Sequence, residues 1–553
     1  MPDISGILNI GRQALSAHQR AIAVTSNNIA NVNTPGYSRQ EAVYETASPS
    51  NGVFGAGVQI RQVRSVVDAF LQQQIISEKS SLGRFGVEKG LLDRVEAIFT
   101  DASGDGINKA ITDFFAATND LSNNPSGIPE RNVLLERGRA LSQTLHSADA
   151  QFKTILRDVD SEIAGRVDEV NALSGKIADL NKQIALVERS GEGNTANDFR
   201  DDRVRLLGEL SEKIEIHTVE DDGGNLTVTA GSGGSAVALV AGERAYSLST
   251  VADPSNSGLS KILFNGDTNI TQFIANGRLR GLIELRDNLL PTYIDRLDKL
   301  SGSIINEFNI QHRKGFDLAG VAGEDFFSPL QSAVFAFDGN RGNAEVSATI
   351  APLPDPPDPA NPPPELTFDA YELSFSQGKF TIRNLNTGAE GEDGSASFDF
   401  EGIHIEVNGD AVEGDRFRVS LHQGLAGTIA VALSDPASIA ASDSSAASPG
   451  GNGNAILLAQ LQDKQVFSLK TTFQGFFAGF TGEVGARAQL SQQNLSVEEA
   501  LSQKLDTLRE GISGVSLDEE LTNLIAFQRA YQASAKLVTT ADELLQTVIG
   551  LKQ

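Results

Sequence analysis

The chain has 553 residues, of which 40% are hydrophobic, so it can bury several cores and lacks the composition of a disordered protein. Its net charge of -27 would repel nucleic acid and anionic lipid, and we therefore discount both as main partners. The absence of cysteine excludes disulfides and thiolate metal sites. The N-terminal segment has no basic region followed by an apolar run, so we expect no cleaved signal peptide. The sequence contains no apolar stretch of about 18 residues, and we therefore expect no segment that spans a membrane.

Both ends of the chain carry a seven-residue apolar repeat. The repeats consist of Leu8, Leu15, Ile22 and Ile29 near the start, and of Leu517, Leu524, Tyr531, Val538 and Leu545 near the end. Such a repeat keeps one stripe on one face of a helix and requires a helical partner. In one interpretation, each terminal helix finds this partner within its own domain. Two matched stripes instead favour pairing of the ends with each other and with neighbouring subunits.

The sequence between the two ends alternates between helical and β patterns. Apolar spacings of three and four predict helices over residues 65–100, 106–122, 130–190, 198–213, 275–313 and 455–512. Alternating Gly, Thr and Val residues predict a small β insertion over 214–272, and a second β region covers 335–433. Within the second region, Asn408-Gly409 predicts a hairpin turn, and the proline-rich segment 352–364 predicts an exposed, extended loop.

These patterns predict an α+β multidomain protein with a nested, discontinuous arrangement. Residues 1–64 plus 513–553 are expected to form a terminal helical coiled-coil assembly domain. Residues 65–334 plus 451–512 would form a helical bundle that contains the insertion at about 214–272. Residues 335–450 would form an outer β-rich domain with the proline-rich loop. The termini would then meet at one pole, and the β domains would project from the other.

A stop and a turn follow the first predicted helix, within residues 26–40 (SNNIANVNTPGYSRQ). Asn31 and Thr34 compete for nearby backbone groups, and Pro35 cannot continue a helix. Gly36 permits a positive φ, and Tyr37 offers a large amphipathic ring for contact. Taken alone, this pattern predicts a turn and no function.

The run at 30–37 (ANVNTPGY) resembles the signature of the flagellar rod, hook and hook-associated family, and residues 513–545 resemble the C-terminal helix of that family. Three internal stretches are similar to the hook-associated members. They are residues 120–145 with Arg131, residues 197–213, and residues 306–327 with His312. The two β regions show no such match and inherit nothing from the family.

This resemblance implies a structural subunit of the bacterial flagellum that has no cofactor and is not an enzyme. It implies export through the flagellar type III apparatus without cleavage, and an extracellular position at the hook–filament junction. The implied partners are further copies of the chain in a ring, the hook protein, a second junction protein, and an export chaperone on the C-terminal helix. The motif turn would end the inner helix, and the two repeats would form the assembly interface.

Two alternatives stay open. The chain would fit a hook or distal rod protein if it polymerised into a long tube. It would also fit a secreted adhesin or enzyme whose active part is the middle β region, although the sequence contains no GxSxG, P-loop or HExxH motif. His404 and Glu406 share a strand face, which we interpret as a solvated pair. We interpret His312 as a structural residue of a turn.

Overall fold

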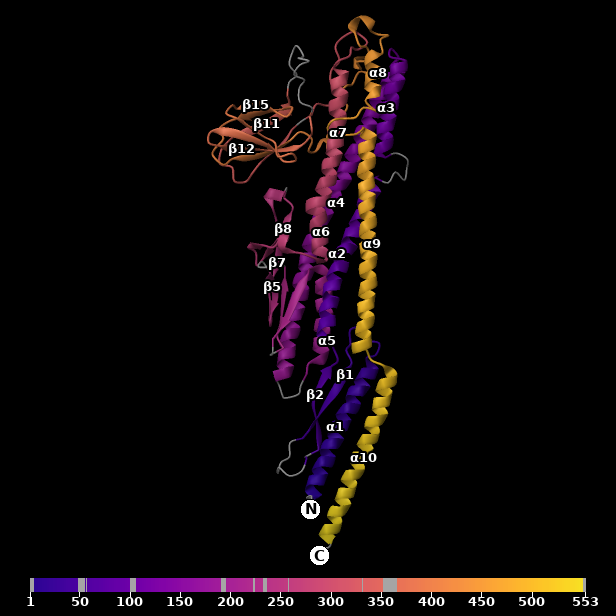
Figure 1. The fold of residues 1–553 in the computed structure, drawn as a ribbon, viewed down its shortest axis with the longest axis vertical. Helices are drawn as coiled ribbons and strands as arrows, with labels where there is room; N and C mark the ends of the chain where they lie inside the picture. The colour runs from indigo at the N-terminus through magenta and orange to yellow at the C-terminus, as the bar shows by residue number, and fades with distance from the viewer. Residues whose placement is uncertain are drawn as a thin grey trace.

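The computed structural model describes residues 4–47, 55, 57–99, 106–189, 195–221, 224–231, 236–256, 258–330, 332–351 and 366–550. Within these ranges long helices combine with several small sheets, as the predicted α+β class requires (Figure 1). The predicted proline-rich loop at 352–364 lies outside the described residues. Among the described helices, none has the length and apolar character needed to cross a bilayer.

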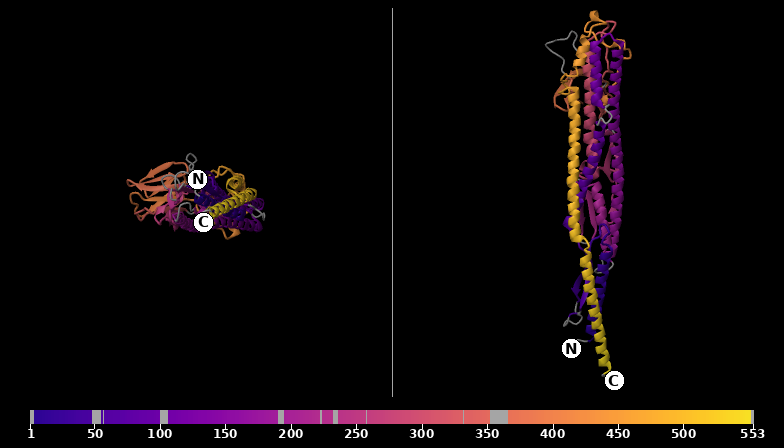
Figure 2. Two further views of the ribbon diagram at one scale, coloured as in Figure 1. Left: turned by 90° about the horizontal axis from the view of Figure 1, so that it is seen from below. Right: turned by 90° about the vertical axis from the view of Figure 1, so that its right-hand side faces the viewer.

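Two terminal helices lie side by side at one end of an elongated molecule (Figures 1 and 2). They are α1 (Ile4–Ala30) and α10 (Leu517–Gly550), and they run antiparallel, so both chain ends lie at the same pole. A hairpin of β1 (Gln40–Thr46) and β2 (Val58–Ser65) packs against α1. These two strands are not among the predicted elements, although the alternation in QEAVYET and VQIRQVRS is a signal for them.

Eight helices form the bundle above this pair. They are α2 (Ala69–Phe99), α3 (Ile107–Asn123), α4 (Ile128–Arg189), α5 (Asn197–Lys213), α6 (Gly277–Glu284), α7 (Leu290–His312), α8 (Gly453–Gln460) and α9 (Phe473–Ser513). The first four predicted helices are confirmed. The one predicted over 275–313 contains a π-helical turn at Leu285–Leu289. The one predicted over 455–512 is wrong as a single helix, because the chain turns at 461–472 and Thr472 caps a new helix with its side chain.

Helix α4 has 62 residues and is the longest of the described helices in the bundle. Its buried side chains recur at spacings of three and four from Arg131 to Ala185, which is the pattern that predicts this helix. Aromatic rings fill the upper core, where Phe99 lies 4.8 Å from Phe480 and Phe308 lies 4.8 Å from Phe326 between ring centroids. Each such ring contributes about 1.5–3 kcal/mol by its burial, so this core fixes α9 against α2, and α7 against the segment that carries Phe326.

The small β insertion lies along the flank of α4 rather than at the opposite pole, which corrects the predicted position (Figure 1). Its strands form one sheet of β3 (Ile216–Glu220), β4 (Leu226–Ala230), β5 (Val237–Ala241) and β6 (Arg244–Ala245), and a second of β7 (Leu248–Ala252), β8 (Ser260–Phe264) and β9 (Thr268–Asn269). Asn171 of α4 fixes the insertion, because its amide exchanges two 2.8 Å hydrogen bonds with the backbone of Leu248.

The outer β-rich domain projects sideways from the upper bundle (Figure 1). Its larger sheet has the order β10 (Ala333–Ala336), β17 (Arg416–Ser420), β12 (Ala370–Ser376), β13 (Lys379–Asn384), β14 (Glu390–Asp393), and its smaller sheet has the order β11 (Glu345–Ile350), β16 (Ile403–Asn408), β15 (Ser397–Phe400). Tyr371, Ile382 and Ile405 belong to a core that is separate from the core of the bundle.

Two predictions for this region are wrong. Asn408 ends β16, and the chain bends at Gly409, where φ is +95°, but it continues to β17 in a different sheet, so Asn408-Gly409 forms no hairpin. The amide of Asp410 instead donates to Oδ1 of Asn343 at 2.8 Å. The β region also ends at Ser420 rather than 433, because the following residues form a turn over Leu425–Gly427 that packs on α4 and α7.

Candidate assembly surface

The buried side chains of α1 are small, and one of them marks its contact with α10. The buried residues of α1 are Gly11, Ala17, Ala21, Thr25 and Asn28. A Cβ at Gly11 would lie 2.6 Å from Cγ2 of Val538 on α10, which is closer than two non-bonded carbon atoms can approach. Only glycine therefore permits this helix separation without a shift of the partner.

The predicted apolar repeat of α1 shares a helix face with Gly11, which lies three residues after Leu8 and four before Leu15. Leu8, Leu15, Ile22 and Ile29 are all half-buried rather than buried. The buried row runs mainly through Gly, Ala, Thr and Asn, which a search for large apolar residues does not detect. The structure thus brings the two terminal helices together.

On α10, the predicted repeat divides between the contact with α1 and solvent. Leu524, Val538 and Leu545 are half-buried, whereas Tyr531 is 37% exposed and Leu517 is 45% exposed. Further large apolar side chains of α10 that are left exposed are Leu521, Ile525, Leu537, Leu544, Val548 and Ile549. The single chain therefore covers only part of the apolar surface of its last helix.

The motif turn ends α1 through a short series of local hydrogen bonds. The Thr34 amide donates to the Asn31 carbonyl at 2.9 Å, and the Tyr37 amide donates to the Thr34 carbonyl at 3.2 Å. Gly36 has φ +85°, where a side chain would be strained. Thr34 and Pro35 are exposed, and Tyr37 is half-buried against the last turn of α1. These contacts confirm the turn that the sequence predicts.

Asn28 holds the turn and the following strand to the helix, and sequence reasoning does not identify it. Its Oδ1 accepts from the Tyr37 hydroxyl at 2.8 Å and from the Gln40 amide at 3.0 Å. Its Nδ2 donates to the Gln40 carbonyl at 2.9 Å. The side chain is 1% exposed, so all of these bonds are protected from water.

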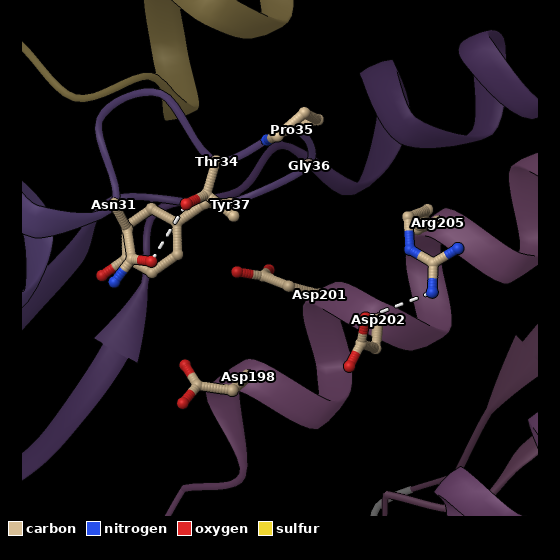
Figure 3. A pocket seen from close by; sticks show the side chains of 9 residues that line it. All are labelled: Asn31, Thr34, Pro35, Gly36, Tyr37, Asp198, Asp201, Asp202 and Arg205. Atoms are coloured by element: carbon tan, nitrogen blue, oxygen red, sulfur yellow. Dashed lines mark hydrogen bonds and ion pairs between the residues drawn. The ribbon is translucent and has the colours of Figure 1, made fainter.

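Carboxylates of helix α5 lie beside the motif turn and accept hydrogen bonds from the residues that follow it (Figure 3). The Ser38 amide donates to Oδ2 of Asp201 at 2.9 Å, and the Gln40 side chain donates to Oδ1 of Asp198 at 3.0 Å. Burial raises the pKa of Asp201 to about 6, and the bonds from Ser38 offset part of this shift. Burial also raises the pKa of Tyr37, assisted by the charges of Asp198 and Asp201.

A small cavity of about 190 Å³ lies between the motif turn and α5. It is lined by Asn31, Thr34, Pro35, Gly36, Tyr37, Asp198, Asp201, Asp202 and Arg205 (Figure 3). Arg205 is already paired with Asp202 and Glu209. The lining is acidic and open, but among the described residues no group of three or more His, Cys, Asp or Glu side chains is placed to hold a metal ion.

Residues that follow the motif connect four elements at one point. The Arg39 amide donates to the Ser513 carbonyl at the end of α9, and the Arg39 carbonyl accepts from Val66, each at 2.8 Å. The Arg39 guanidinium lies 3.6 Å from Glu519 on α10. Asn197 of α5 donates to the Val63 carbonyl of β2 at 2.9 Å. The turn is therefore the joint between the terminal helix pair and the bundle.

Arg131 and His312, which lie in the two other motif-like stretches, meet the same loop at the upper pole. The buried Arg131 guanidinium donates to the Ile439 carbonyl at 2.7 Å and to the Pro125 carbonyl at 2.8 Å. Nε2 of His312 accepts from the Ala440 amide at 2.9 Å, so Nδ1 carries the proton and donates to the Glu324 carbonyl at 2.5 Å. Burial lowers the pKa of His312 to about 4, which keeps the ring neutral. These contacts agree with a structural role for His312.

One grouping of a serine, a histidine and an aspartate in the described part of the chain lies on the outer domain. Nδ1 of His404 is 2.6 Å from Oδ1 of Asp399, and its Nε2 is 3.3 Å from the Ser397 hydroxyl. Asp399 and Ser397 are exposed on an open face of the smaller sheet. Neither they nor His404 line the cavity at the motif turn or a second, open groove between α2 and α9. We interpret the arrangement as a cross-strand polar cluster.

Three family models match the chain. The helical domain of flagellar hook-associated protein FlgK matches residues 92–327, the C-terminal model of flagellar basal body rod FlgEFG proteins matches 511–551, and the flagella basal body rod protein model matches 8–37. The two shorter matches coincide with α1 and its turn and with α10.

Known proteins resemble the chain over nearly all of its length. Flagellar hook-associated protein 1 of Escherichia coli is 27% identical across 99% of this chain and 100% of its own length. The protein of the same name from Bacillus subtilis is also 27% identical, across 98% of this chain and 97% of its own. The solved flagellar hook junction protein FlgK of Burkholderia pseudomallei has a TM-score of 0.66 at 19% identity, and covers 80% of this chain and all of its own.

Proposed function

The chain belongs to the family of flagellar hook-associated protein 1, and we propose that it is a structural subunit of the junction between the flagellar hook and filament. The matched family consists of structural proteins of the flagellum and is not an enzyme family. The observation that carries the proposal is the agreement over the whole length with relatives of that name.

We further propose that the subunits assemble through their terminal helices. The apolar side chains that α10 leaves exposed support this, since a monomer in water does not benefit from them and a neighbouring helix would cover them. The predicted repeats, from Leu8 to Ile29 and from Leu517 to Leu545, would contribute to this interface, and the turn at 31–37 would fix the angle between the terminal pair and the bundle.

The nested domain organisation is part of the same proposal. Residues 1–64 plus 513–553 would act as the assembly domain, residues 65–334 plus 451–512 as the bundle, and residues 335–450 as the outer domain. The packing of α1 on α10 and of α2 on α9 supports the two discontinuous units. The separate core of the outer domain supports the third.

The proposal includes the partners and the location. The matches to rod and hook protein models associate the chain with the rod and hook system of the flagellum. Within that system we propose a ring of identical subunits that contacts the hook protein and a second junction protein. Export through the flagellar type III apparatus to this extracellular site, with a chaperone on α10 beforehand, would fit a helix whose apolar side chains are uncovered.

A hook or distal rod protein is the weaker alternative. The terminal models are shared with such proteins, and the hook protein FlgE of Helicobacter pylori is 33% identical, but only over 18% of this chain. The FlgK helical-domain model covers α4, α5, α6 and α7 and favours the junction. An adhesin or enzyme in the outer domain has no such support.

Replacement of Leu544 by Asp tests the assembly role directly. Leu544 is 49% exposed, so the substitution would leave the monomer folded while placing a charge in the proposed interface. In cells that carry this variant as the sole copy, we expect hooks without filaments. Gln546→Asp, at an exposed polar position on the same helix, is the matched control and should support normal filaments. Normal filaments with both variants would contradict assembly through α10.

A further inference from the structure

Two chain crossings connect the outer β-rich domain to the bundle. The first leads from Phe327, in the core of the bundle, to β10, and the second leads from the end of β17 at Ser420 to the turn over Leu425–Gly427. The strands of the outer domain pack on one another around a core of their own (Figure 1). Domains that are joined in this way move relative to one another unless a large apolar interface prevents it. Contacts made by residues outside the strands therefore decide how the outer domain is oriented.

One face of α7 carries such contacts. Asp295, Lys299 and Gly302 follow one another at spacings of four and three residues, so they share a face of the helix. Oδ1 of Asp295 lies 2.7 Å from Nε2 of His422, two residues after the end of β17. Nζ of Lys299 lies 3.9 Å from Oδ1 of Asp369, just before β12. Two segments of the outer domain that are distant in sequence thus meet the same helix.

Phe368 makes the apolar part of this contact. A Cβ at Gly302 would lie 3.0 Å from Cε1 of the Phe368 ring, so the ring packs directly on the helix backbone at this glycine. The centroids of the Phe368 and His422 rings lie 6.1 Å apart, with their planes nearly perpendicular. Phe368 has φ +54°, which is strained for a residue with a side chain. Such strain persists only where the surroundings enforce it, and here the docked position on α7 does so.

Asp298 of the same helix fixes the bundle end of the second crossing. Its Oδ2 accepts from the Gly424 amide at 2.7 Å, and its Oδ1 accepts from the Ala426 amide at 2.9 Å. The carboxylate is buried, with 1% of the residue exposed, so these bonds are protected from water. The turn is therefore anchored to the bundle by itself. At this crossing, a movement of the outer domain is confined to the short segment between Ser420 and Gly424.

We propose that the outer domain is a hinged arm, and that Asp295 and Gly302 form a latch with His422 and Phe368 that holds the arm against α7. With the latch closed, the arm takes the orientation seen in Figure 1. Without these contacts, the arm turns about its two crossings while both cores stay folded, and Phe368 leaves its strained conformation. The latch is a property of the single chain and does not depend on the function proposed above.

The absence of cysteine in the chain allows a direct distance measurement. Ser147 on α4 and Ser376 at the end of β12 are exposed and lie outside the latch, so Ser147→Cys and Ser376→Cys can carry one spin label on each side of the hinge in the full chain. In the parent chain we expect one narrow distribution of label distances. In the same background, Phe368→Gly combined with Asp295→Ala removes the ring from Gly302 and the partner of His422. This variant should give a broad distribution with a shifted mean.

Phe335→Gly is the matched control, because it removes an exposed ring from the same domain and should keep the narrow distribution. Phe368 also belongs to the core of the outer domain, so circular dichroism has to show that the strands of the double variant are intact. If they are lost, Gly302→Val replaces the double variant, because it changes no residue of the outer domain and puts a side chain where the Phe368 ring packs.

Two results would overturn the proposal. A broad distribution in the parent chain would show that nothing latches the arm. A narrow distribution with the mean of the parent, in a folded variant that lacks the latch contacts, would show that other contacts hold it.

Discussion

The hydroxyl of Tyr37 donates a 2.8 Å hydrogen bond to Oδ1 of Asn28, and this bond folds the motif turn back onto the helix that it ends. The same Asn28 amide binds the backbone of Gln40, at the start of β1. One buried side chain thus holds a helix end, a turn and a strand together. Because Ser38, Arg39 and Gln40 also reach α5 and α9, this arrangement orients the terminal pair on the bundle.

Asn28→Ala should loosen this joint. It leaves the Gln40 backbone and the Tyr37 hydroxyl without their partner, at a cost of about 1–3 kcal/mol for buried polar groups. Hydrogen exchange followed by mass spectrometry over residues 28–46 should show a loss of protection of that size. Asn27→Ala is the control, because Asn27 is exposed and its side chain makes only exposed bonds, a 3.3 Å bond to the Tyr37 hydroxyl and a 3.1 Å bond that it accepts from Asn31. Equal protection in the two variants would contradict the role given to Asn28.

Gly11→Ala should destabilise the terminal helix pair, although alanine favours helices. Its Cβ would lie 2.6 Å from Val538, so α10 has to move, and overpacking of this kind costs about 1–3 kcal/mol. Gly6→Ala is the control, since nothing lies within 4 Å of a Cβ there and the helix should gain up to about 1 kcal/mol. Thermal unfolding followed by circular dichroism measures both. A gain in stability with Gly11→Ala would show that the helices are not in close contact.

Arg131→Met should detach the loop over residues 436–440 from the upper pole. The carbonyls of Pro125 and Ile439 would each lose a buried donor, which costs about 1–3 kcal/mol per group. Arg139→Met on the same helix removes only an exposed pair with Glu136 and should change the stability by less than about 1 kcal/mol. Unfolding in urea compares the two. Similar midpoints for both variants would refute the anchoring role of Arg131.

Asp201→Asn should make the joint less sensitive to pH. The folded-state pKa of Asp201 is raised to about 6, so its contribution to stability is complete below its ordinary value and is lost as the pH rises through about 6. The variant should therefore protect residues 38–46 from hydrogen exchange better than the parent at pH above about 7, and equally at pH about 4. Asp202→Asn, at an exposed neighbour, should behave as the parent at both.

The long helices could be predicted because their apolar side chains repeat at the helical period, as they do along α4 from Leu134 to Ile184. The buried row of α1 could not, because it consists of Gly11, Ala17, Ala21 and other small residues, which carry no apolar signal. The large residues that do carry this signal, such as Leu15 and Ile22, are only half-buried.

The candidate site was predictable in its local part only. The turn at 31–37 follows from Pro35 and Gly36, which act on their own backbone. The carboxylates that accept hydrogen bonds from the residues after this turn, Asp198 and Asp201, lie far along the chain in an ordinary charged helix. Nothing local distinguishes these two residues from Asp202. The hairpin predicted at Asn408-Gly409 was wrong for the same reason, since the pairing of β16 with β11 and β15 is decided by distant strands.

Electron microscopy of flagella from cells that lack this gene tests the junction role most directly. We expect hooks of normal shape that end bare, with filament protein shed into the medium. Normal filaments on those hooks would contradict the junction role, and cells without hooks would place the protein in the rod or the hook instead.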